Sequence, residues 1–170
     1  IPLRDAFPDC AAMAIYDERV FIAEAGTNII RYTAPSEFWR TLPSSNIYRL
    51  GHKGGGAVQA MVPLGGALYI LTDTAIYQAV SGGPVAGQDA QVYFTLIDDV
   101  GCAAPRSVAA ADGRIYFLSE DGPRMFDGSK AERLARGVRD LFRPDSEHPL
   151  ALRNPEGAVG IWHPVEEQYR

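Results

Sequence analysis

The 170-residue chain contains few of the side chains that hold metals or form covalent bridges, since it has two cysteines and three histidines. Cys10 and Cys102 lie far apart in the sequence, and neither belongs to a CxxC pair or stands at metal-ligand spacing from a histidine. A disulfide framework requires more cysteines, and a zinc site requires ligands at closer spacing. The sequence therefore predicts no bound metal and no disulfide scaffold, and it leaves the redox compartment open.

Positive charge and long apolar runs are also scarce. The 16 lysines and arginines are outnumbered by 21 aspartates and glutamates, so the formal charge is −5, and no basic cluster is interleaved with aromatic residues. This composition disfavours tight binding to nucleic-acid phosphates. No apolar run approaches the roughly 18 residues of a membrane-spanning helix, and the first residues do not read as a signal peptide. We expect no membrane span, no cofactor and no specific nucleic-acid binding.

A β-hairpin pattern, in contrast, is abundant, because it occurs four times. Aligning Phe21, Tyr69, Tyr116 and Tyr169 as one repeat position gives spacings of 48, 47 and 53 residues. Periods of about 40 to 50 residues are typical of kelch and WD40 β-propeller blades. The four stretches begin at Ala11, Val58, Ser107 and Ala158 and read "AAMAIYDERVFIAEAG", "VQAMVPLGGALYILTD", "SVAAADGRIYFLSEDG" and "AVGIWHPVEEQYR".

Each copy has the local chemistry of consecutive antiparallel strands. Turn pairs that tolerate positive φ separate the first two strands; they are Asp17 with Glu18, Gly65 with Gly66, and Asp112 with Gly113. The second strands "VFIA", "LYIL" and "IYFL" are apolar throughout, which favours burial on both faces. Third strands follow as "IIRY", "AIYQA" and "RMFDG", and fourth strands are expected at Val92–Ile97 and Asn46–Leu50.

These patterns predict an all-β chain, a β-propeller segment of four-stranded antiparallel blades. Blades are expected at about 8–50, 57–99 and 104–143, and the start of another at 156–170, within one segment over 1–170. A short helical insertion is expected near 130–142, because Ser129 reads as an N-cap with Glu132 three positions later. The chain begins with Ile and ends within an expected strand, so we expect a fragment of a longer polypeptide.

Sites for chemistry are sparse, and each candidate also has a structural interpretation. "GHKGGGAV" at Gly51–Val58 is glycine-rich, but Lys53 precedes the glycines, so the order is wrong for a P-loop. The carboxylates of Asp98, Asp99, Glu120, Asp121 and Asp127 gather near strand ends, where turn formation is favoured over a catalytic pair or an EF-hand. No catalytic, cofactor-binding or metal-binding residue is therefore predicted, and we do not expect the chain to be an enzyme.

The remaining candidates are histidine, tryptophan and arginine side chains. His52, His148 and His163 accompany no recognisable nucleophile motif. Trp39 and Trp162 are interpreted as packing between blades, with a ligand-stacking platform as the alternative. Arg106 precedes a first strand and is expected to brace carbonyls or carboxylates at a crossing between blades.

One stretch resembles a known family. "VGCAAPRSVAAADGRIYFLSEDGPRMFDGS", Val100–Ser129, is similar to the repeat of β-propeller proteins in tailed bacteriophages, particularly the tail nozzle or tail tubular protein B type. Val62–Pro84 and Asp17–Trp39 resemble the two preceding blades, so the likeness covers about the whole chain, although nozzle proteins are much longer.

The resemblance implies a virion structural protein, assembled in the bacterial cytoplasm and located in the phage tail. Copies would form a ring that contacts a tail tube, adaptor or portal protein and lines part of the genome-exit channel. DNA would pass through without specific binding, aided by like-charge repulsion from an acidic lumen.

Two other functions stay open. One is a propeller that binds carbohydrate or recognises a host surface, or a propeller enzyme with a site at its central mouth. The residues flanking the second strands do not converge on such a site; they are Arg19, Ala67, Arg114 and Gln168 on one side, and Glu24, Thr72 and Ser119 on the other. The other is a scaffold propeller of a cellular protein.

Overall fold

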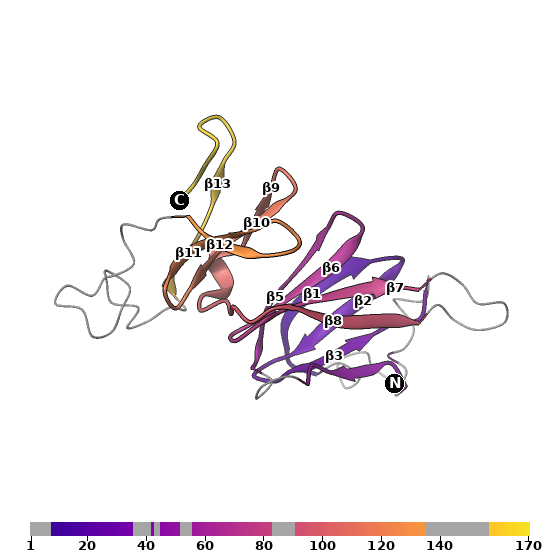
Figure 1. The fold of residues 1–170 in the computed structure, drawn as a ribbon. Helices are drawn as coiled ribbons and strands as arrows, with labels where there is room; N and C mark the ends of the chain where they lie inside the picture. The colour runs from indigo at the N-terminus through magenta and orange to yellow at the C-terminus, as the bar shows by residue number, and fades with distance from the viewer. Residues whose placement is uncertain (1–7, 36–41, 43–44, 52–55, 83–90, 135–156) are drawn as a thin grey trace.

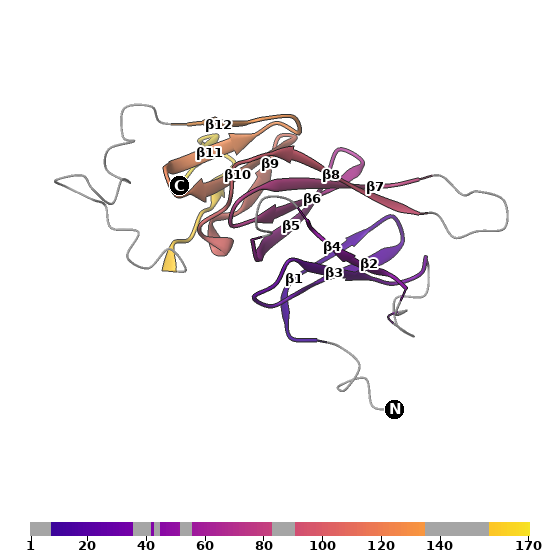
Figure 2. The same ribbon diagram turned by 60° about the horizontal axis from the view of Figure 1, so that its bottom comes forward.

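The computed structural model describes residues 8–35, 42, 45–51, 56–82, 91–134 and 157–170. These residues form an all-β structure of three four-stranded antiparallel sheets and a two-stranded one. Within each sheet the strands are neighbours in chain order, as expected when short turns join antiparallel strands. Figures 1 and 2 show the four-stranded sheets side by side in chain order, with the last hairpin beyond the third sheet.

The bounds of the strands follow the predicted repeat closely. The first sheet contains β1 (Cys10–Tyr16), β2 (Arg19–Glu24), β3 (Ile29–Tyr32) and β4 (Ile47–Arg49). The second contains β5 (Val58–Leu64), β6 (Ala67–Thr72), β7 (Ile76–Ser81) and β8 (Val92–Asp98). The third contains β9 (Ala109–Ala111), β10 (Arg114–Ser119), β11 (Gly122–Phe126) and β12 (Ala131–Arg133), after the 3-10 turn η2 (Pro105–Ser107). The hairpin contains β13 (Trp162–His163) and β14 (Gln168–Tyr169).

The predicted two-residue turns between first and second strands are confirmed. Asp17 and Glu18 have φ of 47° and 55°, and Asp112 and Gly113 have φ of 50° and 72°. Gly65 and Gly66 also have positive φ, of 57° and 80°. Two consecutive positive φ values match the right-handed twist of a hairpin.

Side chains of each second strand alternate between the two neighbouring sheets. Counting from the first residue of the strand, odd positions face the following sheet and even positions face the preceding one. Phe21 of β2 therefore packs in the same core cluster as Leu68 and Ile70 of β6. Tyr69 of β6 packs in a second cluster with Ile115 and Phe117 of β10. This explains why the second strands are apolar throughout: both faces of β6 are buried.

The first strands bring successive sheets together at one side of the structure. β1 lies against β5, and β9 lies against β13. Backbone hydrogen bonds add to this packing, since the Val58 amide donates to the Thr27 carbonyl at 2.9 Å and the Cys102 amide donates to the Thr72 carbonyl at 2.8 Å. Each sheet is thus fixed to the next by an apolar face and by main-chain contacts.

The predicted helix near 130–142 is wrong at its start. Residues 131–133 form β12, in which Ala131 pairs with Phe126 of β11. The Asp127 carboxylate accepts the hydroxyl of Ser129 at 2.8 Å, and also the amides of Ser129 and Lys130, so the expected N-cap is used in a turn. Residues 135–142 lie outside the described part of the chain.

The alignment of Tyr169 with Phe21, Tyr69 and Tyr116 also requires correction. In the three earlier hairpins two residues separate the first strand from the second, whereas four residues separate His163 from its partner Gln168. Tyr169 is consequently the second residue of its strand and not the third. Its ring faces the preceding sheet, as an even position should, and stacks on Tyr116 with centroids 5.6 Å apart.

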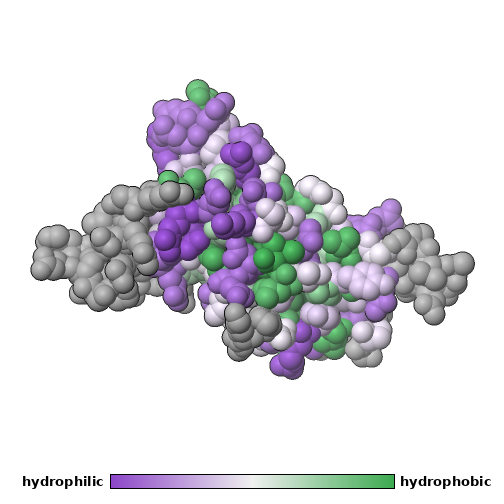
Figure 3. Space-filling view, viewed as in Figure 1, coloured by the Kyte–Doolittle hydropathy of each residue, from purple (hydrophilic) through white to green (hydrophobic). Residues whose placement is uncertain are grey.

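The two halves of the face seen in Figure 3 differ. Hydrophilic residues lie over β9–β12 and over most of the last hairpin, while hydrophobic residues are more frequent over the first two sheets. No described helix has the length and apolar character needed to cross a membrane.

Candidate functional site

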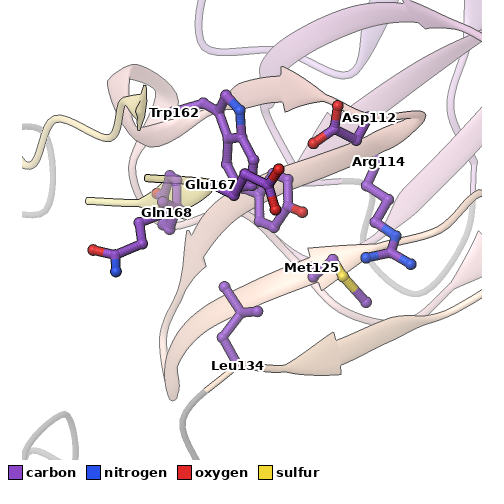
Figure 4. A pocket seen from close by; sticks show the side chains of 9 residues that line it. Asp112, Arg114, Met125, Leu134, Trp162, Glu167 and Gln168 are labelled. Atoms are coloured by element: carbon purple, nitrogen blue, oxygen red, sulfur yellow. The ribbon is translucent and has the colours of Figure 1, made fainter. Parts of the chain in front are cut away.

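A groove lies between the third sheet and the last hairpin. The odd face of β10 contributes Arg114 and Tyr116, β11 contributes Met125, and Leu134 follows β12. The hairpin forms the other side, and the open groove has a volume of about 450 Å³. Figure 4 shows Trp162 and Glu167 across the groove from Arg114 and Met125. The complete lining is Asp112, Arg114, Tyr116, Met125, Leu134, Trp162, Glu167, Gln168 and Tyr169.

Three stacked aromatic rings form one wall of this groove. The Tyr116 ring lies 4.9 Å from that of Trp162, with 22° between their planes, and 5.6 Å from that of Tyr169. Tyr116 is buried, while Trp162 and Tyr169 are partly exposed. The interpretation of Trp162 as packing between successive sheets is therefore confirmed, because its ring rests on a strand of the preceding sheet.

A hydroxyl and a close backbone contact hold the hairpin in place. The Tyr169 hydroxyl donates to the Ser107 carbonyl at 2.7 Å, and the Gly160 amide donates to the Arg106 carbonyl at 3.1 Å. A Cβ at Gly160 would lie 2.4 Å from the Ser107 oxygen, so only glycine allows this approach. Burial raises the pKa of Tyr169 despite the bond to Ser107, and the phenol therefore stays neutral and donates.

The polar side chains that line the groove could form hydrogen bonds with a ligand, but they include no evident reactive group. Arg114 offers hydrogen-bond donors, Asp112 and Glu167 offer acceptors, and Gln168 offers both. An aromatic wall with such groups around it suits a ligand that has an apolar face and hydroxyls. No serine, cysteine or histidine lies among the described residues that line the groove, so they provide no nucleophile and base pair.

A second cleft, of about 360 Å³, contains most of the acidic residues that the sequence suggested. It lies between the second and third sheets. Its carboxylates are those of Asp73, Asp99, Glu120 and Asp121, and Arg124 is the basic residue among its lining. Among the described residues, no three His, Cys, Asp or Glu side chains are grouped so as to hold a metal ion.

Asp121 is occupied by two arginines. Its two oxygens accept from Arg124 Nε at 3.0 Å and Nη2 at 2.8 Å, and Arg133 donates to it as well. Burial alone raises the pKa of Asp121, but the hydrogen bonds from Arg133 and Arg124 together lower it below the ordinary value. The carboxylate is therefore ionised, and it connects the turn after β10 with β11 and β12.

Asp98 and Asp127 also have structural roles, but only Asp127 is the turn residue that the sequence predicted. Asp98 Oδ2 accepts the amide of Ala131 at 2.8 Å, which connects β8 of the second sheet to β12 of the third. Hydrogen bonds from the amides of Lys130 and Ser129 and from the Ser129 hydroxyl lower the pKa of Asp127 to about 2.

The cysteines and His163 show no arrangement for catalysis. Both cysteines have free thiols, with Cys10 exposed and Cys102 buried. Burial raises the pKa of Cys102 to about 11, so its thiol stays protonated at neutral pH and is a poor nucleophile. His163 Nδ1 accepts the Glu166 amide at 3.2 Å within the last turn.

Several candidate residues are not tested by the structure. Trp39, His52, Lys53 and His148 lie outside the described residues. Arg106 is described, and it takes part in the crossing through its backbone carbonyl while its side chain is exposed. The role predicted for its guanidinium in bracing that crossing stays a prediction.

Sequence reasoning missed the groove because it combines residues from two repeat units. Arg114 and Gln168 were compared as equivalent residues around a central mouth, but both line this groove between adjacent units. The signal that would have found it is the four-residue turn before Gln168, which sets Tyr169 opposite Tyr116. No protein-family model matches the chain, and no curated protein sequence matches it.

Proposed function

We propose that the chain is a structural component of a tailed-phage virion, in which its sheets are blades of a β-propeller. The proposed location is the tail nozzle or a ring near the portal, where it forms part of the genome-exit channel. The observation that carries this proposal is the repeated sheet packing, in which both faces of an inner sheet are buried by its neighbours. Such a protein works through packing and not through a reactive group.

The resemblance to phage nozzle proteins supports the choice among propellers. Its most specific stretch, Val100–Ser129, includes η2 and β9–β11 and ends just before β12. Within this stretch the chain forms the crossing into the third sheet and most of that sheet. The stretch also contains two turns of that sheet, one at Asp112 and Gly113 and one at Asp127.

An acidic surface suits passage of DNA. The formal charge of −5 and the carboxylates of the cleft between the second and third sheets give surfaces that repel phosphates. We propose that such a surface faces the channel, so that DNA slides past without being held. A map of the assembly with a strongly basic lumen would contradict this part of the proposal.

The test of the virion assignment is to locate the protein in purified particles. A phage whose copy of the gene carries a small epitope tag is purified, and particles are labelled with gold-conjugated antibody and analysed by mass spectrometry. We expect the protein in particle fractions and gold at the tail end. Its absence from particles, with recovery in the host's soluble fraction, would contradict the assignment.

The groove favours a second candidate, a module that binds carbohydrate on a host surface. The aromatic wall of Trp162 and Tyr169 beside Arg114 and Glu167 is the specific observation behind it. Titration with host-surface oligosaccharides, followed by NMR of the Trp162 indole, tests it. Saturable shifts that vanish in Arg114→Ala would support this candidate, and no shift at millimolar sugar would remove it.

A further inference from the structure

The cleft between the second and third sheets is built from three segments of the chain. The turn between β6 and β7 contributes Asp73 and Thr74, and the turn between β10 and β11 contributes Glu120 and Asp121. The crossing from β8 into the third sheet contributes residues 99–101. The volume of about 360 Å³ lies within the range of small-molecule sites, so the cleft has room for a small ligand.

Main-chain hydrogen bonds fix the crossing to the strands on both sides of the cleft. The Cys102 amide donates to the Thr72 carbonyl at the end of β6, at 2.8 Å. The Ala103 amide donates to the Leu118 carbonyl of β10, also at 2.8 Å. The two walls are thus held in place by the fold itself, and a site that is formed in advance loses less entropy when a ligand binds.

Ser119 lines this cleft with a buried hydroxyl that has no partner. It is the last residue of β10 and an even position, so its side chain faces the second sheet. The residue is 6% exposed and belongs to the lining of the cleft. Its hydroxyl forms no hydrogen bond with another described residue. Because buried polar groups in proteins are normally hydrogen-bonded, this hydroxyl indicates a place for a polar ligand atom.

Thr72 shows that the protein can satisfy a hydroxyl at this repeat position. Thr72 is the last residue of β6, as Ser119 is of β10. Its hydroxyl oxygen accepts the amides of Thr74 at 3.3 Å and of Ala75 at 2.9 Å, within the longer turn before β7. Ser119 instead pairs directly with Gly122 across a two-residue turn. The shorter turn therefore leaves the serine hydroxyl to the cleft.

The cleft is acidic even though an arginine lines it. Arg124 donates to Asp121 through Nε and Nη2, so its guanidinium is already bound within the third sheet. The carboxylates of Asp73 and Glu120 form no hydrogen bond or ion pair with another described residue. Both of these residues are exposed, whereas Ser119 is buried. A ligand that carries positive charge is therefore favoured, with hydrogen-bond donors for a hydroxyl and for carboxylates.

The arrangement of the acceptors selects an extended organic cation. Among the described residues no three acidic side chains are grouped so as to hold a metal ion, and Ca²⁺ needs about six to eight oxygens around it. The described lining contains no aromatic ring, so a guanidinium or a sugar would have no stacking platform. An aliphatic diamine instead has two separate ammonium groups, and its methylene chain can lie against Val100.

We propose that this cleft binds an aliphatic diamine, whose ammonium groups donate to the Ser119 hydroxyl and to the carboxylates of Asp73 and Glu120. Charge-assisted hydrogen bonds of this kind are stronger than those between neutral groups. The site does not depend on the virion assignment. A chain that is found in particles and binds no diamine contradicts only this site, and a chain that binds the diamine but is absent from particles contradicts only the assignment.

The experiment is an NMR titration of the 170-residue chain with the diamine putrescine, at low ionic strength because salt screens exposed carboxylates. We expect saturable shifts of the amides of Thr74, Ser119 and Glu120, and none with the uncharged diol of the same length. Butylamine, which has one ammonium, should bind at least about threefold more weakly. No saturable shift with millimolar putrescine, or equal affinity for butylamine or Ca²⁺, would overturn the proposal.

Ser119→Ala tests the buried hydroxyl. It should raise the dissociation constant of putrescine about tenfold, because a hydrogen bond to a charged group is lost. It should leave the urea midpoint unchanged, because the hydroxyl has no partner in the fold. Thr72→Ala is the structural comparison and should lower the urea midpoint, since it removes the acceptor of two amides. Unchanged putrescine binding in Ser119→Ala would overturn the proposal, as would a loss of stability equal to that of Thr72→Ala.

A pair of variants with the same change in charge tests the carboxylates. Glu120→Gln should raise the dissociation constant of putrescine about two- to fivefold, as expected for an exposed ion pair. Asp17→Asn is the control: it lies on the first sheet, outside the cleft, and its φ of 47° is one that asparagine tolerates. It should leave the dissociation constant unchanged. Equal effects of the two variants would show that only net charge attracts the diamine, and would overturn the proposal.

Discussion

Tyr116 joins two structural units through its ring. It lies at an odd position of β10, and it is buried because Trp162 and Tyr169 of the hairpin stack on it. Offset aromatic pairs contribute about 0.5–1.5 kcal/mol beyond the area that they bury. The hairpin buries few other residues, so this contact should contribute much of its attachment.

The Tyr116 and Trp162 pair can be measured with a double-mutant cycle. Tyr116→Ala and Trp162→Ala should each lower the free energy of unfolding in urea, and the double variant should lose about 0.5–1.5 kcal/mol less than the sum of the two. Val165→Ala, at a residue that is 86% exposed, should change it by less than about 0.5 kcal/mol. Strict additivity would show that the rings do not interact in solution.

Cys102 should make the fold sensitive to alkaline pH. The unfolded chain releases the thiol proton near pH 9.0, whereas the folded chain releases it near pH 11. Stability is therefore unaffected by this group below pH 9 and falls between these values, by up to about 1.4 kcal/mol per pH unit. Urea unfolding from pH 8 to 11 measures this decline, and Cys102→Ala should reduce it. An equal decline in the variant would contradict the assignment to Cys102.

For single residues, a role in a local turn could be predicted from the sequence, but a long-range hydrogen-bond partner could not. Asp127 reads as a turn residue from its position beside Gly128 and Ser129, and it has that role. Asp98 reads the same way, yet its partner is an amide 33 positions later. Local spacing contains no information about such long-range partners, which depend on how sheets are stacked.

The crossing between the second and third sheets depends on one glycine. A Cβ at Gly101 would lie 1.8 Å from the Asp73 carbonyl oxygen, and backbone cannot move aside as a side-chain end can. Gly101→Ala should therefore lower the free energy of unfolding by about 1–3 kcal/mol or more. Gly157→Ala is the matched control, because a Cβ there meets no atom within 4 Å. Equal urea midpoints for the two variants would contradict the close approach.

The attachment of β12 depends on the Asp127 turn. Asp127→Ala removes the acceptor for the amides of Ser129 and Lys130, so β12 should separate from β11 and hydrogen exchange at the Ala131 amide should become faster. Asp127→Asn keeps a side-chain oxygen and should exchange more slowly than the alanine variant. Unchanged exchange in Asp127→Ala would show that strand pairing alone holds β12.

The Asp127 turn should also make the stability of the fold depend on acidic pH. The pKa of Asp127 is about 2 in the folded chain, against an ordinary value of 3.8, because amides and a hydroxyl donate to the ionised form. A lowered pKa stabilises the fold above pH 3.8, and this contribution is lost as the pH falls from 3.8 towards 2. NMR titration of the Asp127 carboxyl carbon measures the value directly. A midpoint at the ordinary pKa would contradict the turn.

Elements that depend on a local conformational preference could be predicted from the sequence. Elements for which two local structures compete could not. Two-residue turns with Asp or Gly identified the first three hairpins, since positive φ there is a local preference. The helix expected near 130–142 was wrong at its start, because Asp127 binds the Ser129 hydroxyl that would have capped it and residues 131–133 form β12. The four-residue turn at 164–167 shifted Tyr169 by one position, and a shift of one residue moves a side chain to the opposite face.

At the scale of the whole molecule, the sequence predicted consecutive four-stranded sheets, and the structure confirms three of them. The direction in which each ring points could not be predicted, because second strands are apolar at odd and even positions alike. The closing of the sheets into a propeller, and its place in a virion, remain proposals.

Electron cryo-microscopy of the assembly, purified from particles, tests the central proposal most directly. The account predicts sheets arranged around an axis coaxial with the tail. A map in which the sheets form an open stack away from any axis would contradict it.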